Sequence, residues 1–171
     1  MTDPTAQVHD PVHGARHAFT PGGENLVVDT WLDPGGVLPP HYHPFQDEYW
    51  SVVEGEVEVT LGRGRRTLRP ADGEVHVPPN TRHGLRNRSA AAVHARCRVA
   101  PALHLRDFLT ESAEAAQQGL FRRGGIPRGL RGARWGAAFI KRHRAETVMS
   151  FPPRLVQSTL VALLARGDEA R

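Results

Sequence analysis

The sequence predicts a mainly β protein, built as a sandwich or barrel, with an α-helical extension at its C-terminal end. Up to about residue 100, short segments rich in Val, Leu, Thr, Tyr and Trp recur at a spacing of about ten residues. Turns containing Gly, Pro or Asp separate them. After Pro101 the apolar residues recur at helical spacing. We therefore expect a flexible N-terminal arm (1–24), a β-barrel (25–100) and a helical extension (101–171) packed on the barrel as a lid or dimer interface.

The expected strands are four to eight residues long in most cases and often alternate. In 57–61, Val57, Val59 and Leu61 face one way, and in 93–99 apolar residues alternate with His and Arg. Period-two alternation indicates one buried and one exposed face. Residues 1–24 have no such period, which favours a loose arm that includes His9, His13 and His17. The expected strands are 26–32, 49–53, 57–61, 67–69, 75–77 and 92–99.

Three helices are expected in the extension. Residues 105–119 carry apolar residues on one side and end at Gly119, a common helix stop. Residues 133–144 can form a second helix. Residues 152–166 begin with two prolines and carry an apolar stripe at a spacing of 3.6 residues, which predicts a third.

Composition excludes several classes of protein. The chain has 171 residues, which suits one domain or one domain with an appendage. Cys97 is the only cysteine, so a disulfide framework and a thiolate zinc finger are excluded. The longest apolar run, 160–165, is too short to cross a bilayer, and the N-terminus has no apolar stretch typical of a secretory signal. We expect a cytoplasmic protein without a membrane span.

Positive charge is concentrated in the second part of the chain. Residues 1–100 carry a net charge of −2 and residues 101–171 a net charge of +6. A Gly-rich stretch between Arg122 and Arg134 contains several of these cations, which could meet a phosphate group or an acidic carrier protein, or form a solvated surface. The few aromatic residues argue against a stacking platform for nucleic acid.

Three histidines and one glutamate are placed so that they can share a metal ion. His41 and His43 are two residues apart on an extended segment, so their rings point to the same face. Glu48 follows after a turn, and His83 lies just beyond the turn at 78–80. Imidazole and carboxylate groups suit Fe(II), Mn, Ni, Co or Zn. Four protein ligands on an octahedral ion leave two positions open, which is typical of catalytic sites.

These residues stand in two motifs that resemble those of the cupin superfamily. The segment Gly35-x5-His41-x-His43-x4-Glu48-x6-Gly55 resembles the first cupin motif. The segment Pro78-x-Asn80-x2-His83-x3-Asn87 resembles the second, with Asn80 at a position where glycine is usual. The second motif usually opens with Gly-Asp, where this chain has Asp72-Gly73-Glu74, so residues 56–71 separate the two motifs by a typical cupin interval. The resemblance covers about residues 25–100.

The resemblance implies a jelly-roll β-barrel with one divalent transition metal on His41, His43, Glu48 and His83. It favours an Fe(II)/O2-dependent oxygenase acting on a small organic metabolite, with Glu48 also able to accept a proton. The alternatives are a non-redox cyclase, isomerase or dehydratase, as in cupins that cyclise polyketides, or a non-enzymatic binding module. A homodimer is the expected assembly.

Three further residues are candidates for the substrate pocket. Trp50 shares the strand parity of Glu48 and should point inward, as a pocket wall or as core. His76 lies opposite two valines and would be outside if those valines form the core. Arg96 belongs to a cationic ridge that could bind a substrate carboxylate, unless that face is solvated or covered by a helix.

Overall fold

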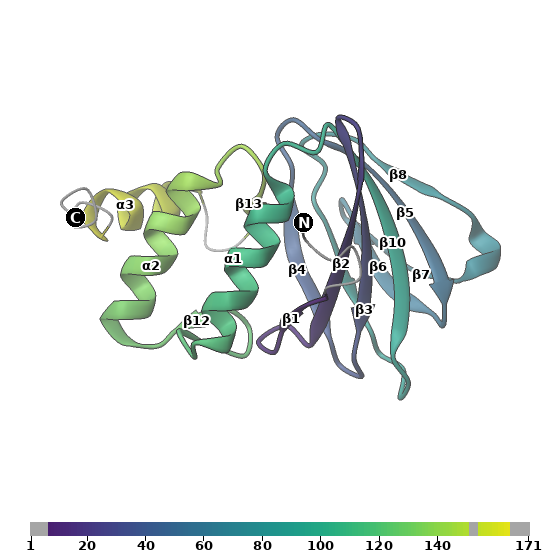
Figure 1. Cartoon of the computed structure of the whole chain (residues 1–171), viewed down its shortest axis with the longest axis horizontal. Coiled ribbons are helices and arrows are strands. Elements are labelled where there is room, and N and C mark those ends of the chain that lie inside the picture. The colour runs from purple at the N-terminus through teal and green to yellow at the C-terminus, as the bar shows by residue number, and fades with distance from the viewer. Residues whose placement is uncertain (1–6, 151–153, 165–171) are drawn as a thin grey trace.

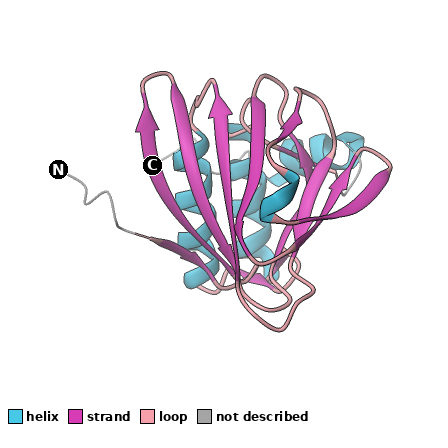
Figure 2. Cartoon of the chain, turned by 90° about the vertical axis from the view of Figure 1, so that its right-hand side faces the viewer, coloured by secondary structure: helices cyan, strands magenta, loops and turns pink. Residues whose placement is uncertain are grey.

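The computed structural model describes residues 7–150 and 154–164, which form two antiparallel sheets with helices on one side (Figure 1). One sheet has the strand order β1-β2-β3-β10-β5-β8, and the other has the order β13-β4-β9-β6-β7. Figure 2 shows the curved strands in front of the helices. The first sheet contains β1 (Val8–Asp10), β2 (Ala15–Gly22), β3 (Asn25–Leu32), β10 (Val93–Ala100), β5 (Asp47–Glu54) and β8 (Val75–Val77). The second contains β13 (Val148–Met149), β4 (Val37–Tyr42), β9 (His83–Arg86), β6 (Val57–Leu61) and β7 (Gly64–Leu68).

Alternating aliphatic side chains from both sheets form the core. In β3 and β10 every second residue is buried, among them Val28, Leu32, Val93 and Val99. Each such side chain contributes roughly 1.5–3 kcal/mol when it is fully buried. The predicted β architecture is therefore confirmed, and all six predicted strands overlap observed ones.

The helical part of the chain follows β10. It contains α1 (Leu105–Gln117), α2 (Gly129–Arg142) and α3 (Arg154–Leu164), with the short hairpin β11 (Phe121–Arg122) and β12 (Ile126–Pro127) between α1 and α2. A 3-10 turn, Pro70–Asp72, precedes β8. Within the described residues, no helix is long and apolar enough to cross a membrane.

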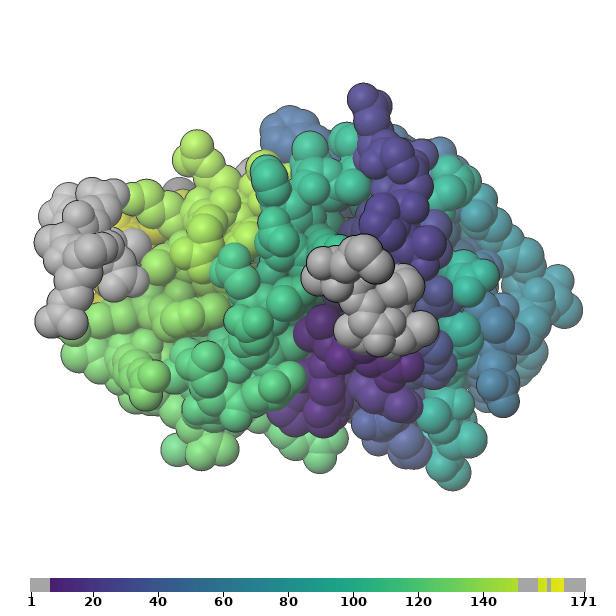
Figure 3. Space-filling model, in the orientation of Figure 1, coloured from purple at the N-terminus to yellow at the C-terminus, as the bar shows by residue number. Residues whose placement is uncertain are grey.

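The helices pack closely on each other and on the strands. α1 lies against β1, as the space-filling view also shows (Figure 3). Gly132 of α2 lies so close to the Leu120 carbonyl that a Cβ there would be 2.3 Å from its oxygen. Glycine at this position therefore lets α2 approach the end of the α1 segment.

The prediction of a flexible arm over residues 1–24 is wrong for residues 8–22. β2 pairs with β3 along its whole length, from Ala15 opposite Leu32 to Gly22 opposite Asn25. β2 does alternate, but its inward residues include His17, which hides the apolar period. The predicted start of the third helix at 152–153 and its end at 165–166 lie outside the described residues, and residues 154–164 are helical.

Candidate metal centre and cavity

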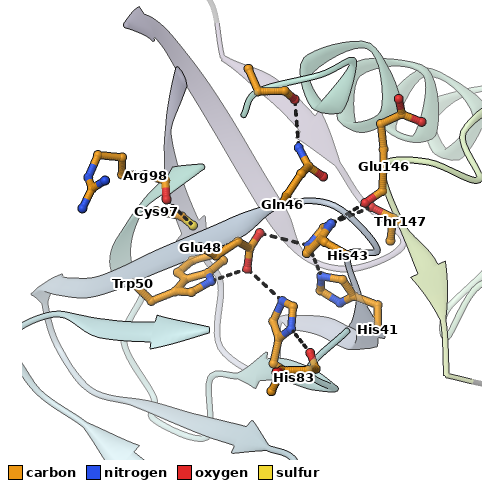
Figure 4. Close-up of polar contacts among 12 residues, drawn as sticks. His41, His43, Gln46, Glu48, Trp50, His83, Cys97, Arg98, Glu146 and Thr147 are labelled. Carbon is orange, nitrogen blue, oxygen red and sulfur yellow. Dashed lines mark hydrogen bonds and ion pairs between the residues drawn. The ribbon is translucent and has the colours of Figure 1, made fainter. Parts of the chain in front are cut away.

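Four polar side chains from both sheets meet inside the barrel. His41 is the penultimate residue of β4 and pairs in register with His83, the first residue of β9. His43 follows β4 directly, and Glu48 lies on β5 of the opposite sheet. His43, Glu48 and His83 are at most 3% exposed. Figure 4 shows the four groups pointing toward one another.

Each histidine ring is fixed by a backbone carbonyl on its outer nitrogen. Nδ1 of His41 donates to the Pro39 carbonyl at 2.7 Å, and Nδ1 of His83 donates to that of Thr81 at 2.9 Å. Nδ1 of His43 donates to the carbonyl of Glu146. Because a carbonyl only accepts hydrogen bonds, each neutral ring carries its proton on Nδ1. The three Nε2 atoms therefore turn lone pairs toward the centre, the orientation that metal-binding histidines need.

The inner atoms lie too close together to be left without a positive charge between them. His41 Nε2 is 3.1 Å from His43 Nε2. Glu48 Oε1 is 3.0 Å from His43 Nε2, and Oε2 is 2.8 Å from His83 Nε2. The buried His83 Nε2 has no geometrically sound hydrogen bond despite that short approach. A divalent cation among these lone pairs would satisfy all four groups, and the donor set fits a transition metal.

The short distances between these side chains also shift the pKa values of His41, His43 and Glu48. Burial, together with His83 and His43 nearby, holds the pKa of His41 well below its usual range. Burial opposes a charge on His43 as well, but Glu48 outweighs it and raises the pKa of that ring. Burial would raise the pKa of Glu48, yet His43 and His83 lower it far below the usual range. Glu48 is therefore a carboxylate, as a metal ligand must be.

Trp50 also contacts this cluster. Its indole N–H donates to Glu48 Oε2 at 2.7 Å, and its ring is 6% exposed. Trp50 therefore fixes the carboxylate and also lines the cavity. Strand parity predicts an inward-pointing ring, which is confirmed, whereas the hydrogen bond to Glu48 has no signal in the sequence.

His76 and Arg96, both predicted as candidates for the substrate pocket, lie outside the cavity. His76 pairs with Asp47 at 2.6 Å on the outer face, and its side chain is 47% exposed. Arg96 binds Asp29 at 2.9 Å and is 52% exposed. The reason is parity: the neighbours of both residues along β8 and β10 fill the core, so these side chains point outward.

A large cavity of about 1500 Å³ lies beside the four groups, between the barrel and the helices. This exceeds the usual range of ligand pockets, roughly 300–1,000 Å³. Its barrel wall includes His41, His43 and Trp50, and its helical wall includes Phe108 and Phe139. Trp135 stacks on Phe139 with ring centroids 4.8 Å apart, which adds a flat aromatic surface. The turn at His13, predicted to be part of a loose arm, also lines this cavity.

The sequence matches the cupin domain family over residues 30–97. This chain contains a cupin domain. The cupin superfamily resemblance inferred from the two motifs is therefore confirmed.

Known proteins match parts of the chain. It is 40% identical over 55 residues to an oxidoreductase of Arthrobotrys oligospora, which is 32% of this chain and 22% of that protein. It is 43% identical over 56 residues to the polyketide synthase CurC of Streptomyces cyaneus, which is 33% of this chain and 36% of that protein. The chain thus spans about a third or less of the length of these two relatives.

A solved structure supports the fold. An RmlC-like cupin from Shewanella frigidimarina superposes with a TM-score of 0.51 at 23% identity. The match covers 60% of this chain and 90% of that one.

Proposed function

We propose that this protein is a metal-dependent enzyme that acts on a small organic molecule bound in the cavity. His41, His43, Glu48 and His83 would hold one divalent transition metal. The observation that carries the proposal is the convergence of three histidine Nε2 atoms and one carboxylate, at the wall of a 1500 Å³ cavity. A buried cluster of this kind is costly unless a cation or a proton relieves it.

The reaction that we propose is Fe(II)/O2-dependent oxygenation. Four protein ligands leave two positions open on an octahedral ion, enough for a substrate oxygen and O2. Iron(II) bound there would supply the activation of O2. The partial similarity to an oxidoreductase is consistent with redox chemistry.

Side chains of this protein would bind the substrate and accept a proton from it. The aromatic surface of Phe108, Trp135 and Phe139 would hold an apolar substrate body and exclude water. Glu48 would accept a proton from the substrate through its carboxylate. Trp50 would keep the carboxylate in place during that step through the hydrogen bond to Oε2.

A non-redox reaction is the second candidate, and the similarity to the polyketide synthase CurC favours it. The same four ligands would then hold Zn, Ni, Mn or Co as a Lewis acid for a cyclisation, isomerisation or dehydration. The third candidate function is non-enzymatic binding of a small molecule.

We further propose a homodimer, and a contact with a phosphate group or an acidic carrier protein at the basic stretch from Arg122 to Arg134. The arginines in this stretch are exposed, and they flank the Gly124–Gly125 turn that lines the cavity. Such a contact would place an incoming substrate at the edge of the cavity.

Elemental analysis of untagged protein tests the metal proposal first. We expect about one equivalent of metal per chain, and no bound metal in any preparation or reloaded form would overturn the proposal. Anaerobic loading with iron(II), followed by nitric oxide and EPR, then tests for an open iron position without needing the substrate. Oxygen uptake with candidate apolar substrates would support oxygenation. Metal binding without uptake in any metal form would favour the non-redox reaction.

A further inference from the structure

A second polar cluster lines the cavity, formed by the turn between β1 and β2. Asp10 ends β1 and is 5% exposed, and His13 follows three residues later. Asp10 Oδ2 is 2.7 Å from His13 Nδ1. Asp10 Oδ1 accepts hydrogen bonds from the backbone N–H groups of Val12 at 2.9 Å and His13 at 3.1 Å. Both Asp10 and His13 line the cavity that His41, His43 and Glu48 of the metal site also line.

The turn is held rigidly against the start of β4. The N–H of Val37 donates to the His13 carbonyl at 2.8 Å, and that of Asp33 donates to the Gly14 carbonyl at 2.9 Å. A Cβ on Gly36 would be 2.6 Å from the Gly14 oxygen, so the two backbones touch. The position of His13 is therefore set by the barrel and not by a free loop.

The carboxylate determines which ring nitrogen of His13 faces the cavity. Burial alone would raise the pKa of Asp10, but His13 and the backbone donors lower it. An ionised carboxylate only accepts hydrogen bonds, so the proton between the two groups lies on His13 Nδ1. In the neutral ring, Nε2 then offers a lone pair. Across from it, a Cβ added to Gly125 would be 3.9 Å from Nε2, so the glycine leaves room there.

This pair lies well away from the metal-site residues along the same cavity. His13 is bonded to Val37 at one end of β4, and His41 lies four residues further along that strand. Four residues of extended strand span roughly 13 Å. The wall of this cavity is largely apolar and includes Phe108 and Phe139 from the helices.

We propose that Asp10 and His13 form a second recognition site, at which His13 Nε2 accepts a hydrogen bond from a hydroxyl group of the ligand. The ligand class is an apolar aromatic molecule with a phenolic or enolic hydroxyl at the end away from the metal. Asp10 is a positioning residue, because it acts through the tautomer of His13. The inference rests on the proposed function only in taking this cavity as the substrate site.

Two matched probes test the hydrogen bond. 2-Naphthol carries the hydroxyl donor, and 2-methoxynaphthalene has the same ring system without it. We expect the wild-type protein to bind 2-naphthol about tenfold more tightly, as one hydrogen bond to a preorganised acceptor allows. His13→Leu should abolish this preference and leave the affinity for 2-methoxynaphthalene unchanged. A wild-type protein without the preference, or a variant that keeps it, would overturn the proposal.

A second measurement does not depend on any ligand. Long-range 1H–15N spectra of the histidines should show the Nδ1–H tautomer for His13 in the wild type and a shift toward Nε2–H in Asp10→Asn. An Nε2–H tautomer in the wild type contradicts the proposal. Metal content, measured on the same samples, should be unchanged by His13→Leu. A wild-type protein that binds metal but shows no preference for 2-naphthol would overturn this site alone. A wild-type protein that shows the preference but binds no metal would overturn the metal centre alone.

Discussion

The ring of His43 donates its Nδ1–H to the carbonyl of Glu146, which lies 103 residues later in the chain. The hydroxyl oxygen of Thr147 is 3.4 Å from the same nitrogen. β13 then pairs with the ligand-bearing strand, with Met149 opposite His41. The segment that follows α2 is thus part of the second sheet and orients one of the metal-site histidines. The helical extension completes the candidate site as well as covering it.

Disturbing this return segment should weaken metal binding. The N–H of Ser150 donates to the Pro40 carbonyl at 3.0 Å and holds β13 beside β4. Ser150→Pro removes that donor, so we expect metal affinity to fall by about 10-fold, the low end for lost outer contacts of a ligand histidine. Ser150→Ala keeps the N–H and is the matched control. Equal metal dissociation constants for the two variants would show that the segment does not support His43.

Removing the metal should destabilise the protein, and this loss of stability should occur only when the ligand histidines are present. A metal that binds only the folded chain adds about 2.7 kcal/mol at a concentration 100 times its Kd. A chelator should therefore lower the Tm of the wild type. His41→Ala and His83→Ala should retain no stoichiometric metal and show no response to the chelator. His76→Ala changes a histidine on the outer face and should behave as the wild type does. Unchanged metal content in the His41 or His83 variant would contradict the ligand assignment.

The indole N–H of Trp50 should strengthen metal binding, because it holds the carboxylate of Glu48. Trp50→Phe keeps an aromatic ring but removes the donor to Glu48 Oε2. Hydrogen bonds to charged groups contribute about 1.5–3 kcal/mol, so we expect metal affinity to fall by roughly 10-fold or more. Tyr49→Phe, on the opposite face of β5, is the control and should leave affinity unchanged. Isothermal titration of the metal-free proteins measures both, and identical affinities would show that the hydrogen bond does not hold the carboxylate.

The barrel strands could be predicted because their periodicity is local. Val57–Leu61 and Val93–Ala100 alternate cleanly, and the spacing of His41, His43, Glu48 and His83 is fixed by two short motifs. Asn80 stands where glycine is usual in the second motif, and its φ of 61° is a left-handed conformation that asparagine tolerates.

Other features depend on contacts between distant segments. His17 breaks the apolar period of β2, yet it is satisfied by Thr30 across the sheet, which the sequence does not reveal. The two-residue strand β13 is too short to have a period of its own. The cavity arises only when the helices meet the barrel. Asp10 and His13 offered one signal, an acidic residue three positions before a histidine, but that spacing is too common to single them out.

His17 should make the protein less stable in mild acid. Its ring is 3% exposed, and burial lowers its pKa to about 4, with Asp10 and His13 as the charged or titratable neighbours. In the unfolded chain the ring takes up a proton near its usual pKa of about 6.5. Between these two values the unfolded state binds more protons, so the free energy of unfolding falls as the pH drops from about 6.5 to about 4. A shift of this size corresponds to about 3 kcal/mol.

Denaturant titrations between about pH 4 and about pH 6.5 should show a shallower pH dependence of the free energy of unfolding for His17→Gln, with a difference of up to about 3 kcal/mol. His9→Gln removes an exposed histidine from the neighbouring strand and should keep the wild-type slope. Parallel curves for the wild type and His17→Gln would mean that the buried ring accepts its proton as readily in the folded chain as in the unfolded one.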